Sequence, residues 1–142
     1  MEEPSFYVRE LAYIPELQEK FSVLDIKSTE LIFEWLQTRF NLPWGQIDWS
    51  RVSNSKSVEV KSWTCSQIGD YILSVQPPSK NDNWIVIWSD SDVAITLHLS
   101  LICRFIGELW YPGKSDVWMI SPNKNFCIEL THESVLSYSL LS

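Results

Sequence analysis

The segment WYPGKSDVWMISPNKNFCIELTHES, residues 110–134, decides the fold class. Val117–Ile120 is a short apolar run, and Phe126–Thr131 is a second run in which apolar and other residues alternate. The polar residues between and after these runs are typical of turns. A third apolar run, Val135–Leu140, follows the second turn. The segment and its continuation therefore predict a C-terminal antiparallel meander of three strands.

The middle run of this meander predicts a strand with two different faces. Phe126, Ile128 and Leu130 face one side, and Cys127, Glu129 and Thr131 face the other. The quoted segment also holds a Gly-Lys-Ser sequence, a cysteine, a histidine and several acids. It is therefore either a site of chemistry or a hairpin whose polar edge another protein recognises.

Two helices are predicted upstream of the meander. Ser28 caps the first helix, which carries apolar residues at helical spacing and ends at Pro43. Its apolar positions are Leu31, Ile32, Trp35, Leu36 and Phe40. The second helix spans residues 64–75 and opens with a Thr-x-x-Gln capping box. We also expect a shorter helix from Pro15 through Phe21.

Three further stretches predict strands. Residues 58–60 alternate apolar and charged side chains, and Trp84–Trp88 is an apolar run typical of a buried strand. Residues 93–98 alternate as a strand, after which the apolar spacing becomes helical from Leu99 to Trp110. A continuous helix from Asp92 is the alternative, although the β-branched residues that follow disfavour it.

These elements predict one domain, residues 1–142, with an α+β fold. Helices ahead of the meander are expected to pack on an antiparallel sheet. No internal repeat or low-complexity segment is visible in the sequence. A chain of this length buries about 70% of its unfolded surface, which is enough for one solid core.

The charge of the chain restricts its partners. The formal net charge is −7, and the sequence pI is about 4.7. An acidic surface repels phosphate, which disfavours nucleic acid as a partner. It attracts a basic protein and accelerates the encounter, although solubility alone also explains such a charge.

The cysteines and apolar runs bear on location. Cys65, Cys103 and Cys127 are odd in number and widely spaced, which favours reduced thiols in the cytoplasm over a disulfide framework. The N-terminus lacks the basic and apolar regions of a secretory signal. Charged residues interrupt the longest apolar segment, 93–110, so no membrane association is expected.

The chemistry-bearing residues match no catalytic or metal motif. A phosphate-binding loop ending at Gly113-Lys114-Ser115 needs a glycine at position 108, which is glutamate. His132 and Glu133 could supply two metal ligands, but no third is adjacent. Cys127 and His132 would lie about 16 Å apart along an extended strand, too far for a nucleophile and its base. We therefore expect no enzyme activity, metal or cofactor.

Several tryptophans and cysteines are expected in the core. Trp35, Trp84 and Trp118 lie in patterned elements, and Cys65 and Cys103 lie in apolar helical patterns. Trp44 and Trp49 lie in an irregular connection after the first helix. We favour a role in which they pin this connection to the core, with contact to a partner as the alternative.

The remaining candidates form a protein-binding surface. No acid among them has a neighbouring base at a spacing that suggests local pairing. Carboxylates on a rigid sheet suit a cationic partner, whereas a solvated edge that blocks strand pairing explains the same charges. The candidate partner-binding residues are Asp90, Asp92, Asp116, Glu129, Glu133, Trp44 and Trp49.

The final third of the chain also resembles a known family. LWYPGKSDVWMISP, residues 109–122, and FCIELTHE, residues 126–133, resemble small bacterial immunity proteins of contact-dependent growth inhibition. The resemblance covers about residues 84–140. The chain departs from the family pattern in having Ser115-Asp116 in place of two aspartates, and Phe126 in place of tryptophan.

The resemblance implies a function. A protein of this kind binds the toxic C-terminal domain of its cognate effector in the cytosol and blocks its active site or substrate surface. Nuclease toxins, commonly basic, are frequent in that class, and an acidic inhibitor would complement them. The alternatives are a secretion chaperone or regulatory adaptor for an effector, and a small hydrolase using His132, Glu133 or Cys127.

Overall fold

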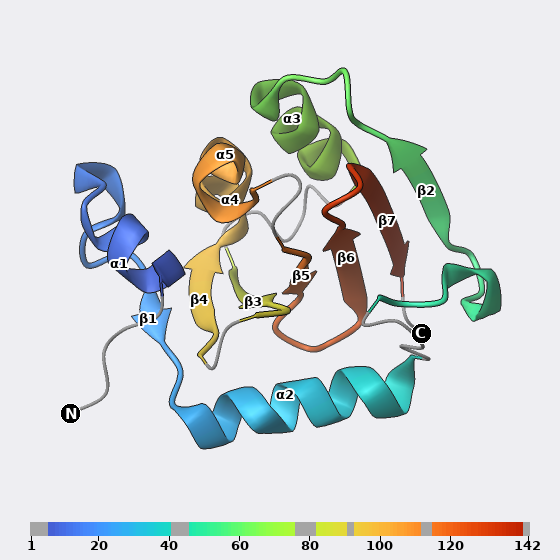
Figure 1. Ribbon diagram of the computed structural model, residues 1–142, viewed down its shortest axis with the longest axis horizontal. Coiled ribbons are helices and arrows are strands. Elements are labelled where there is room, and N and C mark those ends of the chain that lie inside the picture. Colours follow the sequence, from blue (N-terminus) through green and yellow to red (C-terminus); the bar gives the residue numbers. More distant parts are fainter. Residues whose placement is uncertain (1–5, 41–45, 76–81, 91–92, 112–114, 141–142) are drawn as a thin grey trace.

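A seven-stranded antiparallel sheet forms the centre of the molecule (Figure 1). The computed structural model describes residues 6–40, 46–75, 82–90, 93–111 and 115–140. The strand order is β1-β4-β3-β5-β6-β7-β2. The strands are β1 (Ser22–Val23), β2 (Lys56–Glu59), β3 (Asn83–Trp88), β4 (Ile95–His98), β5 (Val117–Ile120), β6 (Phe126–Leu130) and β7 (Val135–Leu140).

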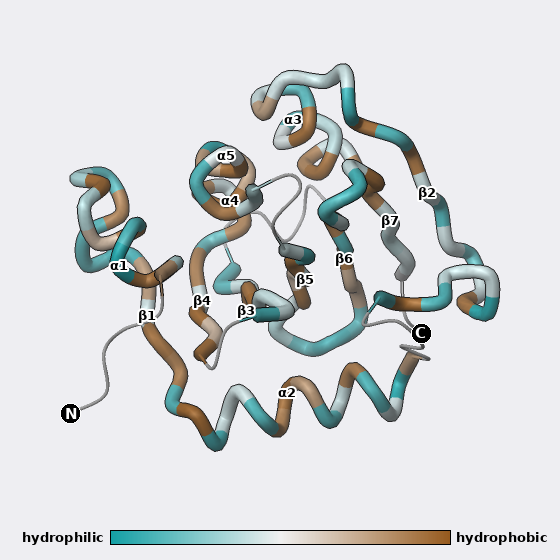
Figure 2. Tube along the Cα trace, in the orientation of Figure 1, coloured by the Kyte–Doolittle hydropathy of each residue, from teal (hydrophilic) through white to brown (hydrophobic). Residues whose placement is uncertain are grey.

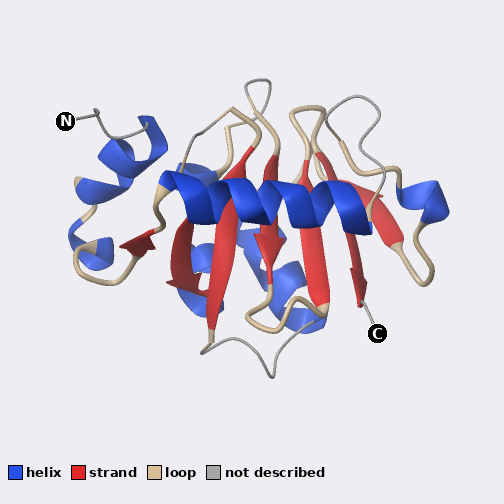
Figure 3. Cartoon of the chain, turned by 90° about the horizontal axis from the view of Figure 1, so that it is seen from below, coloured by secondary structure: helices blue, strands red, loops and turns tan. Residues whose placement is uncertain are grey.

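Helices cover both faces of this sheet, which confirms the predicted α+β fold. Figure 3 shows α2 running across one face, with other helices behind the strands. The helices are α1 (Phe6–Ala12), α2 (Ile26–Arg39), α3 (Cys65–Val75), α4 (Leu99–Arg104) and α5 (Ile106–Leu109). Single 3-10 turns lie at Pro15–Leu17 and Trp49–Arg51.

The predicted meander is confirmed, and its alternation divides the core into two clusters. Phe126, Ile128 and Leu130 pack in the cluster shared with α1, α3, α4 and α5. Cys127 packs in the cluster on the α2 side, with Ile32 and Leu36. Since successive strand residues point to opposite faces, β5 and β6 supply both clusters, whereas β7 supplies Leu136 and Tyr138 to the first cluster and places serines on the other face.

The α2 helix begins earlier than predicted. Asp25, not Ser28, is its N-cap, and the Asp25 carboxylate accepts a hydrogen bond from the Ser28 backbone N–H at 2.7 Å. Hydrophobic and hydrophilic residues alternate along the helix (Figure 2), as expected for one face on the sheet. Leu31 was expected on the buried face but is 56% exposed, and Trp35 is only half-buried.

The α3 helix confirms its predicted capping box. The Thr64 N–H donates to Gln67 Oε1 at 2.8 Å, and the Gln67 N–H donates to Thr64 Oγ1 at 3.1 Å. Cys65 is exposed, so its predicted place in the core is wrong, whereas Cys103 is buried. A Cβ at Gly69 would lie 2.2 Å from the Cys103 carbonyl oxygen, so only glycine permits this close approach of α3 to α4.

The boundaries of the remaining elements agree only in part with the sequence prediction. The chain passes from strand to helix at His98 and Leu99, as predicted, which rules out a continuous helix from residue 92. That helix is broken into α4 and α5 at Phe105, whose φ of −112° and ψ of 33° are not helical. The short helix expected from Pro15 is one 3-10 turn, and α1 and β1 were not predicted.

Of the helices in the described part of the chain, none combines the length and apolar character required to cross a bilayer.

Candidate functional site

Three strand ends meet at one end of the sheet. The β3 strand ends at Trp88, β5 begins at Val117, and β6 ends at Leu130. Because these neighbours are antiparallel, the end of β3, the start of β5 and the end of β6 lie together. The residues flanking these ends are Asp90, Asp116, His132 and Glu133, which we call the acidic end.

Two hydrogen bonds between Ser89 and Asp116 fix the strand ends that carry the two aspartates. The Ser89 N–H donates to the Asp116 carbonyl oxygen at 3.0 Å, and the Asp116 N–H donates to Ser89 Oγ at 3.1 Å. This link was not predicted from the sequence. The Ser-Asp sequence at both 89–90 and 115–116 was the available signal, because serine hydroxyls commonly bond nearby backbone groups at strand ends.

Asp116 is the centre of a polar network. Only 7% of the residue is exposed, and Oδ1 accepts from the His132 backbone N–H at 2.8 Å and from Nδ1 of the same histidine at 2.9 Å. The Gln46 side-chain amide donates to the same oxygen at 3.3 Å. The hydrogen bond to Asp116 raises the pKa of His132 above its usual 6.5, because the carboxylate favours the protonated ring.

Asp90 belongs to a second network, at the edge of the acidic end. The Tyr7 hydroxyl donates to Asp90 Oδ1 at 2.7 Å and is also hydrogen-bonded to the Ser115 hydroxyl. The Tyr7 ring stacks on Trp88 with centroids 4.4 Å apart. Burial raises the pKa of Tyr7 to about 12, so the phenol stays protonated and can donate at neutral pH. Nothing in the sequence indicated a contact between residues 83 positions apart.

Glu129 lies inside the molecule, beneath this surface. It is 1% exposed, and its carboxylate accepts three hydrogen bonds. Oε2 accepts from the Ile47 backbone N–H and the Trp118 indole N–H, both at 2.8 Å, and Oε1 accepts from the Trp49 indole N–H at 2.9 Å. Burial raises the pKa of Glu129, and these three donors oppose that rise. Glu129 therefore fastens the connection after α2 to the sheet.

The remaining candidates differ in position. Glu133 lies beside His132, with 67% of its side chain exposed. Trp49 is half-buried, bonded to Glu129 and packed 5.9 Å from the Phe40 ring, as expected of a residue that pins its loop. Trp44 and Asp92 lie outside the described residues. The structure thus brings Asp90, Asp116 and Glu133 to one end of the sheet and places Glu129 below them.

The Cys127 thiol is held away from the histidine and the carboxylates of the acidic end. Cys127 is fully buried on the α2 side, and desolvation raises the pKa of its thiol well above the usual value. Its neighbour across the strands is Ile120, at the end of β5 remote from Asp116. Among the described residues, no group of three or more His, Cys, Asp or Glu side chains is arranged to hold a metal ion.

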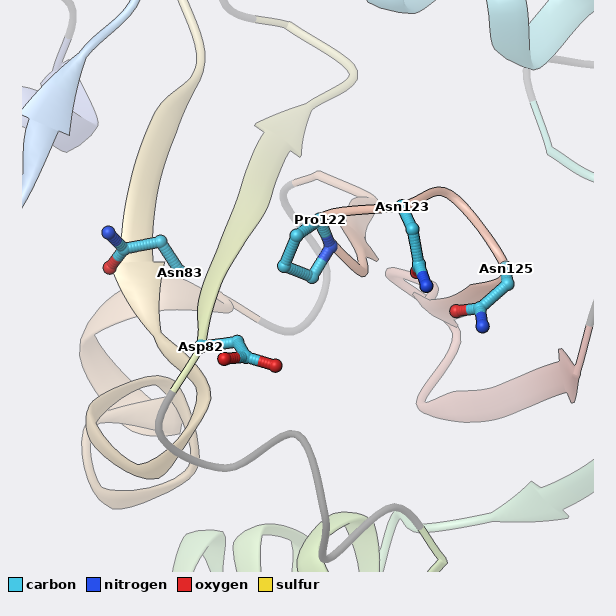
Figure 4. A pocket seen from close by; sticks show the side chains of 5 residues that line it. All are labelled: Asp82, Asn83, Pro122, Asn123 and Asn125. Carbon is cyan, nitrogen blue, oxygen red and sulfur yellow. The ribbon is translucent and has the colours of Figure 1, made fainter.

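A polar hollow of about 360 Å³ lies at the opposite end of the sheet, where β3 begins and β5 turns into β6 (Figure 4). It is lined by Asp82, Asn83, Pro122, Asn123 and Asn125. The Ser121 hydroxyl lies 3.2 Å from Asn123 Oδ1 and 2.9 Å from Asn125 Oδ1, and it accepts from two backbone N–H groups. The two asparagine side chains therefore hold the turn that forms this hollow.

Comparisons with known proteins identify the family. The family model described as CdiI immunity protein EcoliA0-like matches residues 13–139. No curated protein and no solved structure gives a significant match. The match includes all seven strands, apart from the last residue of β7, and all helices except α1. The α1 helix carries Tyr7, whose hydroxyl bonds Asp90 at the acidic end. This chain belongs to the CdiI family and is an immunity protein for a contact-dependent growth inhibition toxin.

Proposed function

We propose that this immunity protein neutralises its toxin by binding the toxic C-terminal domain of the cognate effector through the acidic end of the sheet. The observation that carries the proposal is the convergence of Asp90, Asp116 and Glu133 where β3, β5 and β6 end. These carboxylates come from three separate parts of the sequence. Asp90 and Glu133 are exposed and Asp116 is nearly buried beside them, so together they make one acidic surface suited to a cationic partner.

The rigidity of this surface supports a role in binding. Asp116 is held by three donor groups, and the Tyr7 hydroxyl holds Asp90. Carboxylates fixed before binding lose little conformational freedom when a partner docks, so more of the interaction energy is retained as affinity. The exposed Glu133 adds charge at the rim, where charged groups chiefly accelerate association.

We further propose that the toxin is a basic nuclease. Such an enzyme offers cationic groups to the phosphates of its substrate, and carboxylates at matching positions would occupy those groups instead. The net charge of −7 supports this pairing, because it accelerates encounter with a basic protein. The proposed mechanism is obstruction of the toxin's nucleic-acid surface, and members of the family are generally not enzymes.

Binding to the toxic domain encoded beside this protein tests the proposal. We expect Glu133→Lys to weaken the complex about tenfold in 50 mM salt, mainly through a slower association rate, with a smaller effect at 500 mM salt. Biolayer interferometry measures the association and dissociation rate constants of the complex. Glu30→Lys makes the same change of net charge at an exposed position of α2, so it serves as the matched control.

Two outcomes would contradict this proposal. Equal losses in Glu133→Lys and Glu30→Lys would show that net charge, and not the acidic end, governs binding. A toxic domain that cleaves no nucleic acid would remove the nuclease assignment while leaving the binding surface in place.

A further inference from the structure

A second recognition feature lies on the outer side of α3. Trp63, Gln67, Asp70 and Tyr71 line an open hollow of about 390 Å³. The last three residues have i, i+3 and i+4 spacing, which places them on one face of the helix. Ile68 and Ile72 lie on the buried face, so the hollow faces away from the core.

Aromatic rings form the walls of this hollow in fixed orientations. The Trp63 and Tyr71 rings are 5.4 Å apart and nearly perpendicular, at 77°. The Tyr71 hydroxyl is 3.2 Å from the Tyr138 hydroxyl of β7, and the two rings also make an edge contact. Aromatic faces carry negative electrostatic potential, so a pair of fixed rings attracts a cation.

Asp70 adds a full negative charge to the hollow. It is exposed, and within the described part of the chain its side chain makes no hydrogen bond or ion pair. A carboxylate beside two aromatic rings matches a guanidinium group, which stacks on rings and donates two parallel hydrogen bonds to a carboxylate. A lysine ammonium fits this arrangement less well, because it is a compact and strongly hydrated charge.

Main-chain hydrogen bonds link the segment that begins the hollow to the turn at the acidic end. The Val60 N–H donates to the Ser134 carbonyl oxygen at 2.9 Å, and the Trp63 N–H donates to the Val60 carbonyl oxygen at 3.0 Å. The turn that carries Glu133 is therefore tied to the segment that carries Trp63. One partner docked on the acidic end would extend across this turn to the hollow.

We propose that the hollow lined by Trp63, Asp70 and Tyr71 receives an arginine side chain of the cognate toxin domain. This inference rests on the proposed function, because it requires the toxin to bind at the adjoining acidic end. The arginine serves as an anchor, stacked on an aromatic face of the hollow and paired with the carboxylate. The exposed charges of the acidic end steer the approach, while this anchor slows dissociation.

Equilibrium binding of the toxin domain to variants of the full chain tests the anchor. We expect Asp70→Asn to weaken binding about tenfold, through a faster dissociation rate, as for loss of a charge-assisted hydrogen bond. Asp82→Asn removes the same charge at the other end of the sheet and is expected to bind within twofold of the unaltered protein. Asp70 is exposed, so both variants are expected to fold, and circular dichroism melts verify this.

A pair of tyrosine variants tests the aromatic wall. Tyr71→Phe keeps the ring face and is expected to bind within twofold of the unaltered protein. Tyr71→Leu loses the face and is expected to bind about fivefold more weakly. Replacing the toxin's arginines one at a time, in combination with Asp70→Asn, then identifies the arginine whose effect is not additive with the loss of the carboxylate.

The outcomes separate the two proposals. If the unaltered protein does not bind the toxin domain, both proposals are overturned. If it binds, and Asp70→Asn or Tyr71→Leu binds equally well, only the anchor is overturned. The anchor is also overturned if Asp82→Asn weakens binding as much as Asp70→Asn, or if no toxin arginine couples to Asp70.

Discussion

Glu129 and Glu133 lie four positions apart and occupy opposite environments. Glu129 is 1% exposed and accepts three N–H hydrogen bonds, whereas Glu133 has 67% of its side chain exposed at the following turn. The first holds the connection after α2 against the sheet. The second adds charge to the rim of the proposed binding surface. Two residues of one type therefore differ in environment: Glu129 supports the fold, and Glu133 is exposed to a partner in the proposed complex.

The comparison shows that a carboxylate in a binding protein has to be assigned from its donors and its burial. A buried carboxylate is stable only where donors replace the lost water, and Glu129 has three of them. Asp116 is intermediate, because it is nearly buried yet bonded to the exposed His132. The carboxylates in and beneath the acidic end thus range from fully buried (Glu129) through nearly buried (Asp116) to exposed (Glu133).

The largest expected effect is on the buried member of the pair. Glu129→Ala leaves the N–H groups of Ile47, Trp49 and Trp118 without their acceptor. We expect the free energy of unfolding to fall by about 3–5 kcal/mol, as for other broken buried polar networks. Urea denaturation monitored by circular dichroism measures this loss.

The matched variant for this test is Glu133→Ala, which is expected to change the free energy of unfolding by less than about 0.5 kcal/mol. If the two variants were equally stable, the contrast between the interior and the rim would have no energetic basis. Glu129→Gln keeps the shape of the side chain but turns one acceptor into a donor, so an intermediate loss is expected.

A smaller effect is expected at the edge of the acidic end. Tyr7→Phe keeps the ring on Trp88 but removes the hydroxyl that bonds Asp90 and Ser115. We expect a loss of about 0.5–1.5 kcal/mol in the free energy of unfolding, the net contribution typical of one hydrogen bond. Urea denaturation again provides the measurement. A loss above about 3 kcal/mol would place Tyr7 with Glu129 among the principal supports of the fold.

The smallest expected effect is the pH response of His132. Its pKa is raised chiefly by the hydrogen bond to Asp116, so its stabilising contribution is complete below pH 6.5 and disappears as the pH rises through the higher folded-state value. The contribution is small because the side chain is 46% exposed and screened by solvent. Nuclear magnetic resonance titration of the His132 ring measures the pKa directly.

The same titration separates the two acidic neighbours of His132. Asp116→Asn is expected to lower the pKa of His132 toward 6.5, because the largest cause of the rise is removed. Glu133→Gln is expected to lower it less, since the Glu133 carboxylate is 4.0 Å from Nε2 and acts only through its charge. Equal shifts in the two variants would contradict the assignment of Asp116 as the principal partner.

The elements that sequence patterns predicted are those set by local chemistry. The alternation of β6 and the capping box of Thr64 and Gln67 depend on neighbours in sequence, and both are confirmed. The start of α2 was misassigned because Asp25 and Ser28 are both good capping residues, and local chemistry does not distinguish them. The break between α4 and α5 was not predicted because position 105 holds phenylalanine, and neither glycine nor proline.

The candidate site was harder to predict because its contacts join distant parts of the chain. Alternation placed Glu129 on the face opposite Phe126, but the sequence did not reveal that α2 and the following connection cover that face. Tyr7 lies 83 positions from Asp90 and 108 from Ser115, so no local pattern could relate them. The aspartates themselves were found because turns between strands are recognisable.

The bond from Ile47 to Glu129 has a consequence for divergence among related inhibitors. The donor is a main-chain group, so every residue type at position 47 except proline supplies it. This attachment of the main chain to the sheet therefore does not depend on the identity of the neighbouring side chains. A loop tethered by its backbone is a natural place for an inhibitor to acquire a new target without refolding its scaffold.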